Sequence, residues 1–173
     1  MKNNIFYLVF FILLLVVYRI IPHPPNFTPI LASAVVGPFL IKNRLFGLAI
    51  PIIAMFISDA IIGFHPYQFV VYSTILSIGL IAPLSKKYLY FGLLSVFASV
   101  WFFITTNFAV WLIWDYYPKT FDGLIICYTA AIPFFQNTLL STIFFTGLLI
   151  FLVKYIDIVK EKIFNMFVLE SKL

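Results

Sequence analysis

The sequence has few charged residues, and this scarcity excludes most soluble proteins. Asp, Glu, Lys and Arg make up 10% of the 173 residues, whereas a soluble domain carries about 25%. Hydrophobic residues make up 64% of the chain. A separate soluble domain would need more charged residues than this chain contains. The composition therefore predicts a protein embedded in a membrane.

The sequence also lacks the motifs of common enzyme and metal sites. A single cysteine, Cys127, excludes an intrachain disulfide and a CxxC-type metal site. Phosphate-binding glycine loops, G-x-S-x-G and H-E-x-x-H are all absent. His23, Asp59 and His65 form only a weak candidate metal set, because no common motif links the three positions. We therefore expect no enzyme activity, no metal, no cofactor and no ATPase in this chain.

Six apolar runs fill most of the sequence. A bilayer core about 30 Å thick needs about 20 apolar residues at a rise of 1.5 Å per residue. We predict an all-α polytopic membrane protein, with residues 1–173 forming one integral membrane domain. The expected spans lie at about 5–21, 28–41, 45–63, 68–85, 88–114 and 134–156. Residues 157–173 should form an amphipathic helix at the cytoplasmic interface.

The basic residues predict the orientation of these spans. When the six runs are threaded through a membrane in order, nine of the eleven basic residues fall on one side: Lys2, Lys42, Arg44, Lys86, Lys87, Lys154, Lys160, Lys162 and Lys172. Only Arg19 and Lys119 fall at the opposite ends. Cytoplasmic loops carry the excess of Lys and Arg, so we predict a bacterial inner-membrane protein with both termini in the cytoplasm. The net charge of +5 then reflects topology and not nucleic-acid binding.

The connection at 115–133 is the one long loop that we expect on the outer side. Its apolar piece, Leu124 to Ile132, is too short to span a bilayer. We expect this piece to lie over the outer face or to re-enter it. Pro133 should then begin the last helix, because proline is tolerated in the first turn.

The second run carries small residues that allow a neighbouring helix to approach closely. They are Ala32, Ser33, Ala34 and Gly37, and Ser33 and Gly37 have the small-xxx-small spacing. We favour packing within the bundle as the use of this small face. A partner interface is the alternative.

Polar residues gather at the predicted outer side, whereas the cytoplasmic halves of the runs are almost purely Leu, Ile, Val and Phe. In hydrocarbon, a polar side chain needs a partner or a water-filled cavity. We therefore predict an outward-opening cavity that binds a ligand. Its candidate residues are Arg19, His23, Asn26, Asp59, His65, Tyr72, Asn107, Trp111, Gln136 and Asn137. The alternative is that these groups satisfy one another, above all through a salt bridge between Arg19 and Asp59.

Four motifs follow one another between residues 19 and 137. They are R-x-x-P-H-P-P-N-F-T-P from Arg19, S-D at Ser58 with G-x-H from Gly63, T-N-F-x-x-W from Thr106, and P-F-F-x-N from Pro133. This succession resembles a bacterial family of uncharacterised membrane proteins described as transport proteins. That family in turn resembles the S components of energy-coupling-factor vitamin transporters in size, helix number and outward-facing pocket.

The resemblance implies a function in nutrient uptake. An S component captures a vitamin-like or precursor nutrient at the outer face and moves it inward. It usually docks on a shared transmembrane subunit and paired ATPases through small residues of its first helix. Residues 6–17 contain neither Ala nor Gly, so docking would use the small face of the second run, or the protein would work alone. A non-transporting membrane scaffold or assembly subunit is the alternative function.

Overall fold

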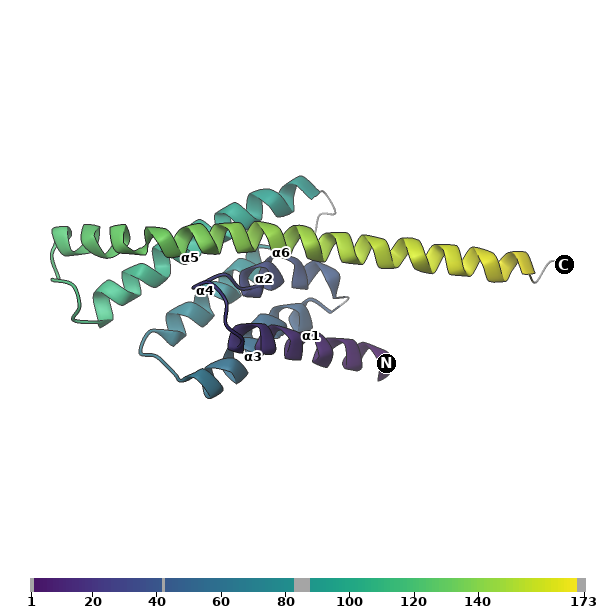
Figure 1. Cartoon of the computed structure of the whole chain (residues 1–173), viewed down its shortest axis with the longest axis horizontal. Helices are drawn as coiled ribbons and strands as arrows, with labels where there is room; N and C mark the ends of the chain where they lie inside the picture. Colours follow the sequence, from purple (N-terminus) through teal and green to yellow (C-terminus); the bar gives the residue numbers. More distant parts are fainter. Residues whose placement is uncertain (1, 42, 83–87, 171–173) are drawn as a thin grey trace.

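The computed structural model describes residues 2–41, 43–82 and 88–170, and within these ranges the chain is all-α (Figure 1). Its six helices are α1 (Lys2–Ile20), α2 (Ile30–Leu40), α3 (Arg44–Ile62), α4 (Gln68–Ile81), α5 (Tyr88–Ile113) and α6 (Phe121–Glu170). The predicted all-α class and the number of helices are confirmed. Of the residues that predicted the orientation, Lys42, Lys86, Lys87 and Lys172 lie outside the described residues.

Local chemistry explains where the early helices end. α1 ends at Ile20, just before Pro22, because proline disfavours a helix in the residue before it. α3 begins after Asn43, whose side chain accepts a hydrogen bond from the Leu45 N–H at 3.0 Å. α3 ends at Ile62 and is followed by its C-cap, Gly63, whose φ of 120° favours glycine.

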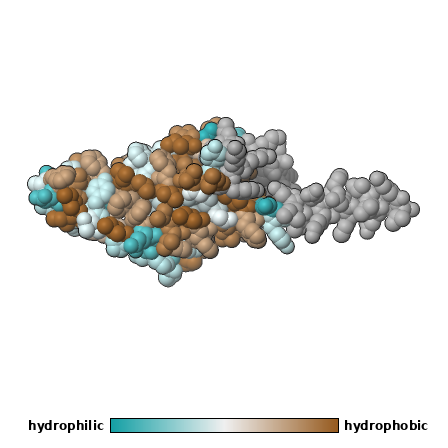
Figure 2. All heavy atoms as spheres, turned by 90° about the horizontal axis from the view of Figure 1, so that it is seen from above, coloured by the Kyte–Doolittle hydropathy of each residue, from teal (hydrophilic) through white to brown (hydrophobic). Residues whose placement is uncertain are grey.

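Three helices of the described residues are long and apolar enough to cross a membrane, at Arg44–Ile62, Leu89–Ile113 and Phe121–Ile156. Three further apolar stretches, Leu8–Ile20, Ile30–Leu40 and Gln68–Ile81, are shorter. By this measure the structure supports three spans and not the predicted six. Hydrophobic residues cover most of the described face in Figure 2, far beyond the apolar patches of soluble monomers. These features indicate a membrane protein.

The course of α6 corrects the sequence prediction. Residues 121–133 are not a surface loop, because α6 runs unbroken from Phe121 to Glu170 with Pro133 inside it. Thr120 caps its start by accepting a hydrogen bond from the Gly123 N–H at 3.1 Å. An internal proline removes one backbone hydrogen bond, and the packing of α6 against α5 offsets that loss. The predicted tail is likewise a continuation of α6 as far as Glu170 and not a separate helix.

The helices form a bundle crossed by a hairpin. α5 and α6 make the hairpin (Figure 1), which packs on α2 and α4. The start of α1 and the end of α6 point toward the same end of the molecule (Figure 1). The turn between α5 and α6 lies at the opposite end.

α2 lies at the centre of this arrangement. It contacts α3, α4, α5 and α6, and nine of its eleven residues are buried. A helix that is apolar on all sides is expected in the interior. Ala32, Ser33 and Ala34 have no exposed surface. Packing within the bundle is therefore confirmed as the use of the small face, and no surface of these residues is left for a partner.

Two glycines bring α2 and α3 into backbone contact. A Cβ atom placed on Gly47 would lie 2.4 Å from the carbonyl oxygen of Gly37 and 2.6 Å from its carbonyl carbon. These are backbone atoms within or beside a helix, so they cannot rotate away as a side chain can. The close crossing of the two helices therefore requires glycine at position 47.

We expect Gly47→Ala to destabilise the protein by about 1–3 kcal/mol, the usual cost of overpacking a tight interior. Gly92→Ala is the matched control, because a Cβ atom there meets nothing within 4 Å. The control should leave stability unchanged or raise it by up to about 1 kcal/mol. Thermal unfolding of both variants in one detergent measures the difference. Equal melting temperatures would contradict the close crossing of α2 and α3.

Candidate ligand-binding site

A cavity of about 510 Å³ lies at the end of the bundle away from the start of α1. All six helices line it, together with the connections 21–29 and 63–67. Five of the ten residues predicted for the site line this cavity: Arg19, His23, Asn26, His65 and Asn107. A cavity of this size falls in the range of about 300–1,000 Å³ that is typical of small-molecule sites.

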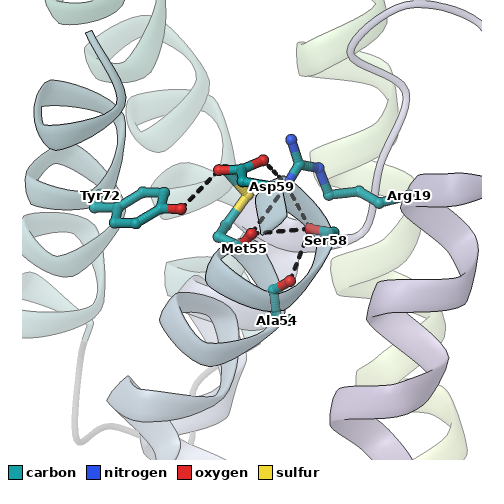
Figure 3. Close-up of polar contacts among 6 residues, drawn as sticks. All are labelled: Arg19, Ala54, Met55, Ser58, Asp59 and Tyr72. Carbon is teal, nitrogen blue, oxygen red and sulfur yellow. Dashed lines mark hydrogen bonds and ion pairs between the residues drawn. The ribbon is translucent and has the colours of Figure 1, made fainter. Parts of the chain in front are cut away.

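An ion pair between α1 and α3 stands at the wall of the cavity (Figure 3). Arg19 Nη1 lies 2.6 Å from Asp59 Oδ1 and also donates to Ser58 Oγ at 2.6 Å. The Asp59 side chain is 1% exposed and that of Arg19 is 18% exposed. The predicted Arg19–Asp59 salt bridge is confirmed. Each charge stabilises the other in an apolar surrounding, where either alone would be costly.

Tyr72 of α4 completes this network. Its hydroxyl donates to Asp59 Oδ2 at 2.7 Å, so both oxygens of the carboxylate have partners (Figure 3). Neither Asp59 nor Tyr72 lines the cavity. The two residues hold Arg19 in place from outside the cavity, Asp59 directly and Tyr72 through Asp59, and so connect α1, α3 and α4.

Arg19 keeps hydrogen-bond donors that the network does not use. All of its hydrogen bonds within the described residues come from Nη1, which leaves Nε and Nη2 without partners there. Figure 3 shows the second terminal nitrogen of the guanidinium pointing away from Asp59. Because Arg19 lines the cavity, these donors are available to a bound molecule.

His65, in the connection between α3 and α4, also lines the cavity. Its Nδ1 is buried and has no hydrogen-bond partner among the described residues. Such atoms are rare in folded proteins. Burial lowers the pKa of His65, while Asp59 acts to raise this pKa and Arg19 to lower it further. The ring is therefore neutral at neutral pH, with one N–H donor and one acceptor nitrogen.

A tight turn places Asn26 beside the cavity. The Phe27 N–H donates to the Pro24 carbonyl at 2.9 Å, and Asn26 has a φ of 61°. This geometry fits a type II turn with Pro25 at its second position and Asn26 at its third. Asparagine suits the third position because, after glycine, it tolerates a positive φ best.

Helix α6 holds this turn in place. Asn137 Nδ2 donates to the Pro25 carbonyl at 2.9 Å, and Ser141 Oγ donates to the Asn26 carbonyl at 3.4 Å. Asn137 does not line the cavity. Its role in the structure is to anchor the first loop.

Two further predicted residues also lie away from the cavity wall. Trp111 Nε1 donates to the Pro118 carbonyl at 2.9 Å, which braces the turn between α5 and α6. Gln136 is exposed on α6. Neither residue is among those that line the cavity.

Asn107 lines the cavity from α5. Its Nδ2 donates to the Phe103 carbonyl one turn earlier, at 2.7 Å. Within the described residues its side-chain oxygen has no hydrogen-bond partner. The side chain of Asn107 is therefore bonded to its own helix and not to a neighbouring one, whereas its backbone carbonyl accepts from Cys127 Sγ of α6 at 3.5 Å. The side-chain oxygen presents an acceptor to the cavity.

Aromatic side chains form a patch on the cavity wall. Phe102 and Phe103 of α5 and Phe134 and Phe135 of α6 all line the cavity. The rings of Phe103 and Phe135 have centroids 4.8 Å apart. The wall thus combines this patch between α5 and α6 with polar side chains from α1, α5, α6 and the two connections.

The contribution of α6 is the part of the site that the sequence prediction missed. Ala131, Phe135, Thr138 and Thr142 line the cavity at spacings of three and four residues, which is the pattern of one helix face. The predicted loop up to Pro133 hid only Ala131, and the helix cap at Thr120 is the signal that could have revealed it. Phe135, Thr138 and Thr142 lie in the predicted span 134–156, where Phe and Thr do not stand out from other residues of a membrane helix.

The weak candidate metal set does not come together. The part of the chain that the structure describes contains no group of three His, Cys, Asp or Glu side chains placed to hold a metal. Both carboxylate oxygens of Asp59 already accept hydrogen bonds, one from Arg19 and one from Tyr72.

Residues 1–164 match the Family of unknown function (DUF6580), and the chain belongs to that family. No curated protein and no solved structure matches the chain. Membership of this family carries no assigned activity.

The ion pair makes a direct prediction about stability. Arg19→Met and Asp59→Asn should each destabilise the protein. The first leaves the buried carboxylate of Asp59 without its positive partner, and the second removes the negative charge that pairs with Arg19. The double variant should lose less than the sum, by a coupling energy of about 1–3 kcal/mol. Unfolding free energies of the four proteins in one detergent measure this coupling.

The exposed pair Lys119 and Asp115, 3.9 Å apart, is the control. The same comparison of the wild type, Lys119→Met, Asp115→Asn and the double variant should give a coupling energy near zero, because exposed ion pairs contribute little to stability. Strictly additive losses for Arg19 and Asp59 would show that the two charges do not stabilise each other.

Proposed function

We propose that this protein is an S-component-like membrane transport protein, which captures a small vitamin-like or precursor nutrient at the outer face and moves it inward. The observation that carries the proposal is the cavity of about 510 Å³, whose wall combines polar side chains that keep unpaired atoms with a patch of aromatic rings. A cavity that combines an apolar surface with a few directed polar groups is typical of a small-molecule site.

The proposal includes six membrane crossings in a bacterial inner membrane, with both termini in the cytoplasm. The 11 residues of α2 rise by only about 16 Å, half of the hydrocarbon thickness. Such a short helix can cross inside the bundle, because protein and not lipid surrounds it. Arg44, at the predicted cytoplasmic side, donates to the last carbonyls of α4, those of Leu80 and Ala82. This contact suits a basic residue near a helix C-terminus.

The structure also bears on how such a transporter would be energised. Docking of a shared transmembrane subunit through the small face of α2 would require a surface that is buried here. Residues 6–17 of α1 contain no small residue to replace it. These two observations favour a protein that works alone over one that depends on a shared energy-coupling module.

A non-transporting scaffold is the second candidate, and one observation favours it. Asp59 and Tyr72 are paired within the protein, and Asn137 serves only to anchor a loop. The cavity speaks against a scaffold, because a scaffold has no need for the unpaired atoms of Arg19, His65 and Asn107.

Reporter fusions test the six crossings. Fusions after Lys42, Lys87 and Lys160 should report the cytoplasm, and fusions near Pro66 and Lys119 should report the outer side, because the basic residues lie on the cytoplasmic side. Alkaline phosphatase and green fluorescent protein reporters distinguish the two sides. Phosphatase activity after Lys87 would contradict the six-span arrangement.

Asn107→Ala tests whether the cavity binds a ligand. The wild-type protein in detergent is screened against water-soluble vitamins and their precursors by thermal shift. Loss of a hydrogen bond to the ligand should weaken binding of any stabilising compound by about 1–3 kcal/mol, or tenfold or more. Stability without ligand should hardly change, because the Asn107 side chain bonds only its own helix.

Gln136→Ala is the matched control, since it removes an exposed amide outside the cavity. It should bind the compound as the wild type does. A scaffold would behave differently: Asn107→Ala would unfold at lower temperature, and no compound would stabilise the wild type.

A further inference from the structure

We propose that the cavity selects an uncharged heteroaromatic molecule that presents a hydrogen-bond acceptor to Arg19. This inference rests on the proposed function, because it names the class of molecule that the cavity takes. Three features of the cavity wall carry it: the balance of charge, the pattern of donors and acceptors, and the aromatic patch.

The cavity wall has no net charge to attract an ion. Arg19 is the one Asp, Glu, Lys or Arg among the residues lining the cavity in the described part of the chain. Asp59 balances its charge at a distance of 2.6 Å. An anionic ligand at Arg19 would bring a second negative charge close to Asp59, and a cationic ligand would face Arg19 itself. Both arrangements are unfavourable in a site of low dielectric constant.

The unpaired polar atoms define what the uncharged molecule must offer. A guanidinium has donors and no acceptor, so the free Nε and Nη2 of Arg19 require an acceptor such as a carbonyl oxygen or a ring nitrogen. The free side-chain oxygen of Asn107 requires a donor. The neutral ring of His65, which lines the cavity, carries one donor and one acceptor nitrogen. An amide edge or a ring lactam carries both kinds of group side by side.

The aromatic patch favours a flat ring over an aliphatic chain. Phe103 and Phe135 contact each other at 4.8 Å between centroids and line the cavity together with Phe102 and Phe134. Aromatic rings gain from edge-to-face and offset contacts with such a patch, beyond the gain from burial alone. A ring system with a polar edge would satisfy both sides of the cavity at once.

The test compares three sets of compounds built on the same nitrogen heteroaromatic rings. Each ring carries a carboxamide, a carboxylate or an aminomethyl group, and so is uncharged, anionic or cationic at pH 7. Dissociation constants for the wild-type protein in detergent are measured by ligand-observed NMR. We expect the carboxamides to bind at least tenfold more tightly than the carboxylates and amines on the same rings.

Two cavity variants and one control place the binding in this cavity. Asn107→Ala and Thr106→Val, both at positions that line it, should weaken the binding of the carboxamides, and Gln136→Ala should not. Asp59→Asn removes the charge that balances Arg19, so this variant should shift the preference toward the carboxylates. The ranking in the wild type decides the inference even if Asp59→Asn fails to fold.

The outcomes separate this inference from the function on which it rests. Tightest binding of carboxylates or amines, lost in Asn107→Ala, would overturn the choice of an uncharged ligand and leave the proposed function standing. Binding that does not depend on Asn107 or Thr106, or no binding in any set, would overturn both.

Discussion

The ion pair between Arg19 and Asp59 is the constraint on which the cavity end of the bundle depends. Two opposite charges 2.6 Å apart, one of them almost fully buried, hold α1 against α3. Tyr72 adds α4 through the second carboxylate oxygen. Because an unpaired charge is so costly in an apolar surrounding, the three helices can hardly separate here. The same contact fixes the guanidinium, and so directs its remaining donors toward the cavity.

The polar residues of this end divide into two groups with different physical roles. Asp59, Tyr72 and Asn137 have partners within the protein and build the frame of the cavity. Arg19, His65 and Asn107 line the cavity and keep atoms without partners in the described structure. A membrane bundle that needed polar groups only for its own stability would use the first group and dispense with the second. This division is the physical basis for assigning a ligand to the cavity.

The sequence predicted the features that follow from single residues and local patterns. Prolines after Ile20 end α1, small residues place α2 in the interior, and the rarity of outer-side charges predicted the pairing of Arg19 with Asp59. Five of the ten residues that it predicted for the site line the cavity, because polarity marks a candidate but does not show which way a side chain points. Trp111 and Asn137 have the right chemistry and face other partners.

The extent of α6 was beyond the sequence prediction for a different reason. Proline normally ends or begins a helix, so the sequence predicts a boundary at Pro133, whereas packing against α5 carries the helix through it. The phenylalanine and threonine residues of α6 that line the cavity follow Pro133, and their residue types alone do not distinguish them from the rest of an apolar helix. The most direct measurement of the central claim is native mass spectrometry of the protein purified in detergent from its own host. We predict a bound small molecule that is released from the wild type and absent from Asn107→Ala. A wild-type protein that is empty in every preparation would contradict a ligand-binding cavity.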